Sequence, residues 1–171
     1  MNITWRPFAL RPIFDGAPFD FTGSYVEKAW RRASSLATPD GLAFTMWPHT
    51  EFPRWSLPGL EAGVAAQKQG EALFLRFHVA LYRAFFVDNK NLLERDTLVT
   101  VARDVGLSIN EFVSDLEDQG FREMVRRQCE EATDSYFVSA VPTVLIGPTR
   151  RQIGMVDQQA YLSDLAACGL S

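Results

Sequence analysis

Residues 140–147 read AVPTVLIG, and residues 153–165 read IGMVDQQAYLSDL. The β-branched and apolar run from Thr143 to Gly147 predicts a strand, GPTR a tight turn, and RQIGMV the hairpin partner of that strand. A helical pattern follows from about Asp157 to Ala167, with Gly169 just beyond its end. The C-terminal part of the chain is therefore expected to be a β-hairpin followed by a helix.

Pro142 stands directly before the first of these strands. A peptide bond that precedes proline adopts the cis form at modest cost, and a strand that starts after such a bend leaves the preceding backbone unpaired by the sheet. Here the preceding residue is Val141, whose N–H and C=O would be left unpaired by the sheet. The residues alone also fit an ordinary trans proline at the start of a strand.

Upstream of this segment the pattern is helical. Ser24 and Glu27 form a capping-box pattern at the start of YVEKAWRRASSLA, and Ser108 and Glu111 form a second one. The other helices are expected at residues 60–69, 71–87, 94–105, 109–117 and 121–136, with Gly70 as a break.

Two segments near the start of the chain have no helical pattern. Ile3–Leu10 is rich in β-branched and aromatic residues and predicts a short strand. Between Leu42 and Pro58, prolines forbid a regular helix while large aromatic side chains demand burial, which predicts an ordered, packed loop. Strands at both ends with helices between them indicate an α/β fold interrupted by a helical insertion.

The composition excludes several classes of partner. The net charge is −4 and there is no run of Lys and Arg, so neither nucleic acid nor a membrane is expected to bind. The apolar stretch Leu73–Val87 contains Arg76 and Arg83, which argues against a membrane span. Arg6 and Pro7 interrupt the apolar core that a secretory signal needs, so we expect a cytoplasmic protein.

The cysteines and histidines form no recognisable site. Cys129 and Cys168 lie in separate predicted helices without C-x-x-C or zinc-site spacing, and reduced, unrelated thiols are expected. His78, on an apolar helix, and His49, beside Trp47, are expected to be structural, and no metal site is predicted. Ser139 is weakly supported as a nucleophile because no histidine is near it in the sequence.

Several segments together resemble the DsbA-like thioredoxin family, in particular its FrnE-type and 2-hydroxychromene-2-carboxylate isomerase/kappa-class transferase branch. WRPFALRP (5–12) is similar to the family's second strand, and PHTEFPRWSLPGLEA (48–62) and residues 76–108 are similar to its helical insertion. AVPTVLIG and the segment after it resemble the cis-proline strand, the next strand and the closing helix. The resemblance therefore favours a cis bond at Pro142.

The resemblance implies an N-terminally incomplete thioredoxin-like fold. It implies one domain over residues 1–171, with a thioredoxin-like part at about 1–23 and 137–171 and a helical insertion at about 24–136. The implied activity is thiol–disulfide oxidoreductase, with Val141, Pro142 and Thr143 binding peptides, protein thiols or glutathione as a co-substrate. A glutathione-dependent isomerase or transferase, and a non-catalytic peptide-binding domain, are the alternatives.

One part of the family pattern is missing from the sequence. The family's unit begins with a strand and a helix that carry C-x-x-C, or a single Ser or Cys, ahead of the strand at Ile3–Leu10. No residue is therefore carried over as a nucleophile, and the catalytic residues and the activity stay open. Because the missing strand would lie between Ile3–Leu10 and Thr143–Gly147, we expect unpaired strand edges and a homo-oligomeric or aggregation-prone product.

Overall fold

A computed structural model describes residues 3–42 and 44–170 of the chain. Met1, Asn2, Ala43 and Ser171, which the expected domain ranges include, lie outside the described residues. The described elements are listed here in chain order: α1 (Tyr25–Ala37), η1 (Thr38–Asp40), α2 (Leu57–Lys68), α3 (Glu71–Phe86), α4 (Arg95–Asp104), α5 (Ile109–Glu117), α6 (Gln119–Asp134), β1 (Thr143–Ile146), β2 (Arg150–Ile153) and α7 (Gln158–Ala167).

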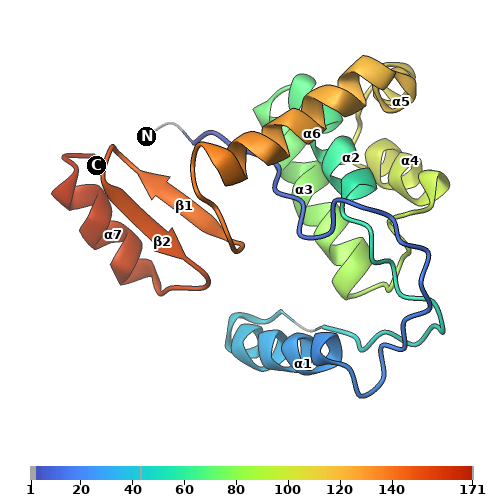
Figure 1. Ribbon diagram of the computed structural model, residues 1–171, viewed down its shortest axis with the longest axis horizontal. Helices are drawn as coiled ribbons and strands as arrows, with labels where there is room; N and C mark the ends of the chain where they lie inside the picture. Colours follow the sequence, from blue (N-terminus) through green and yellow to red (C-terminus); the bar gives the residue numbers. More distant parts are fainter. Residues whose placement is uncertain (1–2, 43, 171) are drawn as a thin grey trace.

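The fold is mostly helical and carries a small antiparallel sheet, as expected for a thioredoxin-like α/β fold with a helical insertion. Helices α2 to α6 pack together on one side of the molecule, and the hairpin with α7 stands on the other (Figure 1). Helix α1 lies below α3 in this view (Figure 1), and its Trp30 packs against Phe86 of α3. Among the described residues, no helix combines the length and the apolar character needed to cross a bilayer.

The main core lies among helices α2 to α6. Its buried side chains come from every one of these helices and include Ala65, Phe77, Leu98, Phe112 and Val125. On α3, Phe74 and Phe77 are buried and Arg76 is exposed, so one face of this helix packs into the core. On α6, Cys129 lies on the buried face.

A second, aromatic cluster surrounds Trp30 of α1. The Trp30 ring lies 4.8 Å from the ring of Phe86 on α3 and 5.8 Å from that of Phe52 in the loop between α1 and α2. Trp47 of the same loop is buried and its indole N–H donates to the carbonyl oxygen of Glu51 at 2.8 Å. The prediction of an ordered, packed loop at Leu42–Pro58 is therefore confirmed for the described residues.

The predicted strand at Ile3–Leu10 is wrong. These residues belong to no strand, and the chain crosses the helices instead, with the Trp5 ring 5.8 Å from the Phe74 ring. The side-chain amide of Gln67 donates to the Trp5 carbonyl oxygen at 3.5 Å. A β-strand exists only through backbone pairing. Nothing in the described residues pairs with this segment, so its β propensity is not realised.

The two predicted capping boxes differ. At α1, the Ser24 hydroxyl accepts from the N–H of Glu27 at 3.2 Å, as predicted. Ser108 does precede α5, but its hydroxyl forms no cap bond. Instead the Gln69 side chain accepts from the Ser108 N–H at 2.7 Å and donates to the Ser108 carbonyl at 3.1 Å. A contact from Gln69, directly after the end of α2, therefore replaces the local cap.

Candidate functional site

The register of the hairpin determines which backbone groups of β1 are free. The N–H of Gly154 donates to the Pro142 carbonyl oxygen at 2.8 Å, and β1 pairs with β2 through Val144↔Gln152 and Ile146↔Arg150. In an antiparallel pair, residues that exchange bonds alternate with residues whose N–H and C=O point away. The residues whose backbone groups face β2 are therefore Pro142, Val144 and Ile146.

The alternate residues of β1 point their backbone groups outward. Thr143 and Leu145 turn their N–H and C=O to the side away from β2, where the described sheet has no further strand. Val141 stands two residues before Thr143, so its backbone groups point to the same side. Among the described residues, no hydrogen bond is found for the N–H or C=O of Val141. The edge thus offers backbone donors and acceptors at every second residue.

The turn before β1 is held in a defined shape. The Val141–Pro142 peptide bond is cis, the form that the family resemblance favours. The Thr143 hydroxyl donates to the Ala140 carbonyl oxygen at 2.7 Å, across the proline. The Val141 side chain is 44% exposed. Val141, Pro142 and Thr143 therefore lie together at an accessible corner, and their role in binding stays a prediction.

Helix α7 covers one face of the hairpin. Asp164 is only 7% exposed, and its carboxylate accepts from Arg150 at 3.1 Å and from the Gln152 amide at 2.6 Å. Both donors project from β2 toward α7. Leu145 and Ile153 project from the opposite face, where they are 42% and 50% exposed. One face of the sheet is thus packed, and the other leaves apolar side chains accessible.

Arg151 connects the hairpin to the segment that leads into it. Its guanidinium donates to the Phe137 carbonyl oxygen at 3.1 Å and also to the carbonyl of Tyr136. Phe137 has a φ of 52°, a left-handed conformation that is uncommon for a bulky side chain. Sequence reasoning missed Arg151 and Asp164, because nothing in their local pattern indicates partners so far along the chain.

The cysteines are free thiols in unrelated places. Cys129 of α6 is 8% exposed, and burial raises the pKa of its thiol. Because the thiolate is the nucleophile in disulfide exchange, this environment suppresses its reactivity. Cys168 follows α7, and its sulfur lies 3.5 Å from the Ile146 carbonyl oxygen. Among the described residues, no contact joins either thiol to Val141, Pro142 or Thr143.

The histidines and Ser139 occupy three different surroundings. The His78 ring lies 5.0 Å from the Trp5 ring and 4.7 Å from the Tyr82 ring, and burial lowers the pKa of His78. His49 is exposed with its ring 5.2 Å from that of Trp47. Ser139 is exposed in the segment before β1. These contacts support packing roles for the two histidines.

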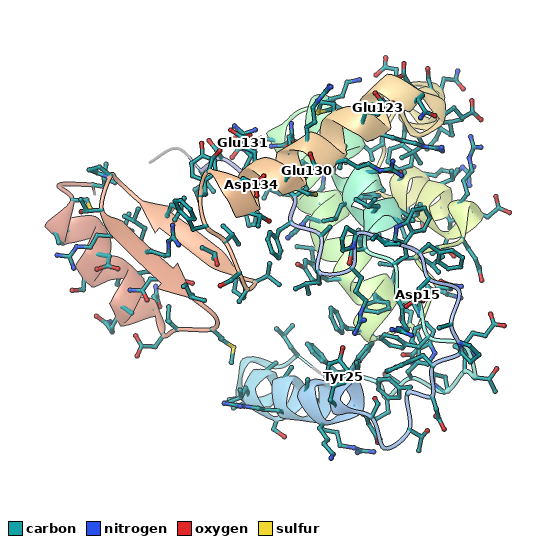
Figure 2. The ribbon with its side chains drawn as sticks, viewed as in Figure 1. Asp15, Tyr25, Glu123, Glu130, Glu131 and Asp134 are labelled. Carbon is teal, nitrogen blue, oxygen red and sulfur yellow. The ribbon has the colours of Figure 1, made fainter. Side chains whose placement is uncertain are left out.

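Acidic side chains gather along the exposed side of α6, where Glu123, Glu130, Glu131 and Asp134 project outward (Figure 2). The last three belong to the half of the helix that leads toward the hairpin. Within the described part of the chain, no group of three His, Cys, Asp or Glu side chains is arranged to hold a metal ion. Glu123, Glu130, Glu131 and Asp134 are all exposed to solvent.

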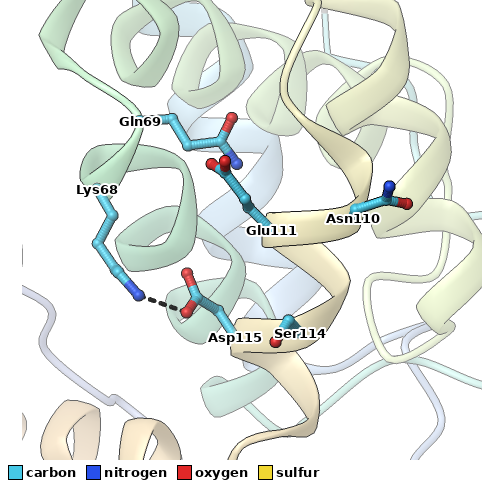
Figure 3. Close-up of a pocket in the computed structure, with 6 residues that line it drawn as sticks. All are labelled: Lys68, Gln69, Asn110, Glu111, Ser114 and Asp115. Atoms are coloured by element: carbon cyan, nitrogen blue, oxygen red, sulfur yellow. Dashed lines mark hydrogen bonds and ion pairs between the residues drawn. The ribbon is translucent and has the colours of Figure 1, made fainter.

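A shallow polar hollow of about 410 Å³ lies between the end of α2 and α5 (Figure 3). It is lined by Lys68, Gln69, Asn110, Glu111, Ser114 and Asp115. Lys68 is already ion-paired with Asp115, and Gln69 is bonded to the Ser108 backbone. Lys68, Asp115 and Gln69 are thus engaged within the protein. The free edge of β1 is the better candidate site.

The family assignment rests on a match over nearly the whole chain. The family model described as the DSBA-like thioredoxin domain matches residues 1–166. The chain belongs to this family. In the DSBA-like thioredoxin family the strand after the cis proline is part of the thioredoxin unit, and β1 of this protein has that place. The characteristic chemistry of the family is thiol–disulfide exchange.

Two known proteins are similar to this DSBA-like chain. A crystal structure of a candidate protein disulfide isomerase from Nitrosomonas europaea superposes with a TM-score of 0.76 and 16% identity, covering 92% of this chain and 78% of that one. This likeness shows the fold. YwbO of Bacillus subtilis (strain 168) is 32% identical over 73 residues, which are 43% of this chain and 36% of the relative. That match therefore spans little more than a third of YwbO.

Proposed function

We propose that this protein binds extended polypeptides at the corner formed by Val141, Pro142 and Thr143, in the service of the thiol–disulfide exchange that characterises its family. The observation that carries the proposal is the backbone of Val141, whose N–H and C=O have no partner among the described residues. A donor and an acceptor on one extended residue match the backbone of a bound strand.

The ligand is a peptide or protein segment that contains a thiol or a disulfide. The exposed side chain of Val141 and the outward groups of Thr143 continue the same edge, so a bound segment gains contacts beyond a single residue. Glutathione has a peptide backbone of its own and is the smaller candidate, which corresponds to the isomerase or transferase alternative. A cytoplasmic location stays a prediction from the sequence.

Cys129 is not suited to carry out thiol–disulfide exchange. Its thiol is buried, and the raised pKa leaves little thiolate at neutral pH. Cys168 lies against the Ile146 carbonyl oxygen, on the side of the hairpin that α7 covers. The proposal for the described residues is therefore a binding role, and no cysteine of this chain is assigned as the redox centre.

The test uses the ¹⁵N-labelled protein and two probes. One is reduced glutathione, and the other is an acetylated, amidated pentapeptide with a central serine in place of cysteine and apolar neighbours. We expect the pentapeptide to shift the amide resonances of Val141 and Thr143 and to slow hydrogen exchange at Val141. Shifts confined to other regions of the protein would overturn the proposal. Stronger shifts with glutathione would favour the transferase alternative.

A matched pair of variants separates the backbone contact from the side chain. Val141→Pro removes the N–H and Val141→Ala keeps it. Because a hydrogen bond contributes about 0.5–1.5 kcal/mol, the proline variant should bind the pentapeptide roughly 2–10-fold more weakly than the alanine variant. Equal affinities of these variants would contradict a role for the Val141 N–H.

A further inference from the structure

Two neighbouring arginines of β2 hold two different elements. Successive residues of a strand point to opposite faces of the sheet, so Arg150 and Arg151 project in opposite directions. Arg150 donates to the Asp164 carboxylate of α7 at 3.1 Å. Arg151 donates to the carbonyl oxygens of Tyr136 and Phe137, just after α6. β2 is therefore tied to α7 by one arginine and to the end of α6 by the next.

Arg151 binds carbonyl groups that follow a helix. Carbonyl oxygens at the end of a helix lack intrahelical partners and lie at the negative end of the helix dipole, where a cation is favoured. The two donors are Nη1 and Nη2, so the guanidinium acts as a fork on two successive carbonyls. Figure 1 shows that α6 runs into the connection to β1. Arg151 thus joins the hairpin to this connection.

Phe137 has an unfavourable backbone conformation at the same place. Its φ of 52° lies in the left-handed region, which costs free energy for a residue with a side chain and which glycine usually occupies after a helix. The Phe137 side chain is 73% exposed, so burial does not offset this cost. The described bonds at this turn are those of Arg151 and a bond from the Val138 N–H to the Ala132 carbonyl oxygen at 2.9 Å. Hydrogen bonds rather than side-chain packing therefore maintain the turn.

The turn determines how the chain enters the proposed peptide site. Only two residues separate Val138 from Val141. The other end of this short segment is fixed by the Thr143 hydroxyl, which donates to the Ala140 carbonyl oxygen at 2.7 Å. A change of backbone direction at Phe137 would therefore reach Val141 within four residues.

We propose that Arg151 is a positioning residue of the peptide site, because it holds the left-handed turn at Phe137 and thereby orients the backbone of Val141. This role rests on the proposed function, since Arg151 prepares the site without touching the ligand. A site whose bound conformation exists before binding has a higher affinity, because less ordering is needed when the ligand arrives.

The first measurement needs no peptide. When φ is positive, the amide proton and the Hα proton of a residue lie close together and give a strong NOE. We expect this NOE at Phe137 in the wild type, and in Arg151→Ala a weaker NOE together with a shifted Val141 amide resonance. Arg127→Ala removes an exposed arginine of α6 and should change neither signal. Wild-type signals in Arg151→Ala would contradict the positioning role.

A rescue experiment separates the turn from general stability. Glycine adopts a left-handed φ without steric cost, whereas alanine keeps the Cβ atom and the cost, and both replacements remove the Phe137 ring. Arg151→Ala loses two hydrogen bonds from a charged group and should bind the acetylated, amidated pentapeptide about tenfold more weakly. Adding Phe137→Gly should return the affinity to within about threefold of the wild type, and adding Phe137→Ala should not. Equal affinities of the two double variants would overturn the proposal.

The two measurements together distinguish the role of Arg151 from the peptide site itself. If the wild type did not bind the pentapeptide, the peptide site would be wrong and the role of Arg151 with it. If the wild type bound it and Arg151→Ala changed neither the NOE nor the affinity, the peptide site would stand and the role of Arg151 would be wrong. The expected result is binding by the wild type, weaker binding by Arg151→Ala and recovery only with glycine at position 137.

Discussion

The backbone N–H of Gly154 donates to the carbonyl oxygen of Pro142 at 2.8 Å, and this bond fixes which groups of β1 are available for binding. It shows that Pro142 turns its backbone carbonyl toward β2, as Val144 and Ile146 turn their backbone groups. The backbone groups that consequently point away from β2 are those of Val141, Thr143 and Leu145. The proposed peptide site follows from this alternation.

Asp164 is expected to hold α7 on the hairpin. Its buried carboxylate accepts from Arg150 and Gln152 of β2. Asp164→Ala leaves these donors without their acceptor, and we expect a loss of about 1–3 kcal/mol in the local stability of α7. Hydrogen exchange of the α7 amides measures this loss. The exposed Ser163→Ala control should exchange like the wild type, and equal exchange in both variants would contradict the role of Asp164.

The two thiols should differ in reactivity. Cys129 is buried with a raised pKa, while Cys168 is partly exposed. We expect Ellman's reagent to modify Cys168 at least about tenfold faster than Cys129 in the native protein. Single Cys→Ser variants assign the two phases. In an insulin-reduction assay with dithiothreitol, the wild type should not exceed the Cys129→Ser, Cys168→Ser variant, and higher activity would restore a redox role for these thiols.

Glu61 should make the stability of the helical core depend on pH. Burial raises the pKa of Glu61 above its usual 4.5, and the nearby Arg122 and Arg126 offset this only in part. The folded state therefore holds the proton more tightly than the unfolded state. The contribution of this group is fully present below about pH 4.5 and is lost as the pH rises through the raised pKa.

Replacing Glu61 by glutamine removes this titration. We expect the Tm of Glu61→Gln, relative to the wild type, to increase as the pH is raised from 4.5 toward neutrality, followed by differential scanning fluorimetry across that range. Glu131→Gln on the exposed side of α6 is the control and should show no such trend. A Tm difference that stays constant with pH would contradict the effect of burial at Glu61.

Trp30 should be the most sensitive position of the aromatic cluster. Its side chain is 4% exposed and contacts rings from α3 and from the loop before α2. Trp30→Ala removes these contacts, with an expected cost of about 3–5 kcal/mol measured by urea unfolding. Leu36→Ala lies on the same helix at an exposed position and should cost about 0.5 kcal/mol or less. Similar costs would show that the cluster is loosely packed.

Much of the fold could be predicted because its signals are local. The helices follow from apolar periodicity and from caps such as Ser24, whose bond to Glu27 forms as expected. The hairpin follows from the β-branched run after Pro142. Ile3–Leu10 could not be predicted correctly, since a β-favouring sequence becomes a strand only beside another strand.

The site was accessible to sequence reasoning only in part. Val141, Pro142 and Thr143 follow from the family resemblance, and the structure brings them together at one exposed corner. The contacts that hold this corner in place are long-range. Arg151 reaches the Phe137 carbonyl and Arg150 reaches Asp164, and both bonds join residues that are 14 positions apart. Charged surface positions carry no local signal of such partners.

Hydrogen exchange at single-residue resolution in dilute protein tests the free edge of β1 most directly. The N–H groups of Thr143 and Leu145 point away from β2, and those of Val144 and Ile146 are bonded to it. The predicted result is rapid exchange at Val141, Thr143 and Leu145 and slow exchange at Val144 and Ile146. Slow exchange at Thr143 and Leu145 with rapid exchange at Val144 would contradict the register, and with it the accessible edge.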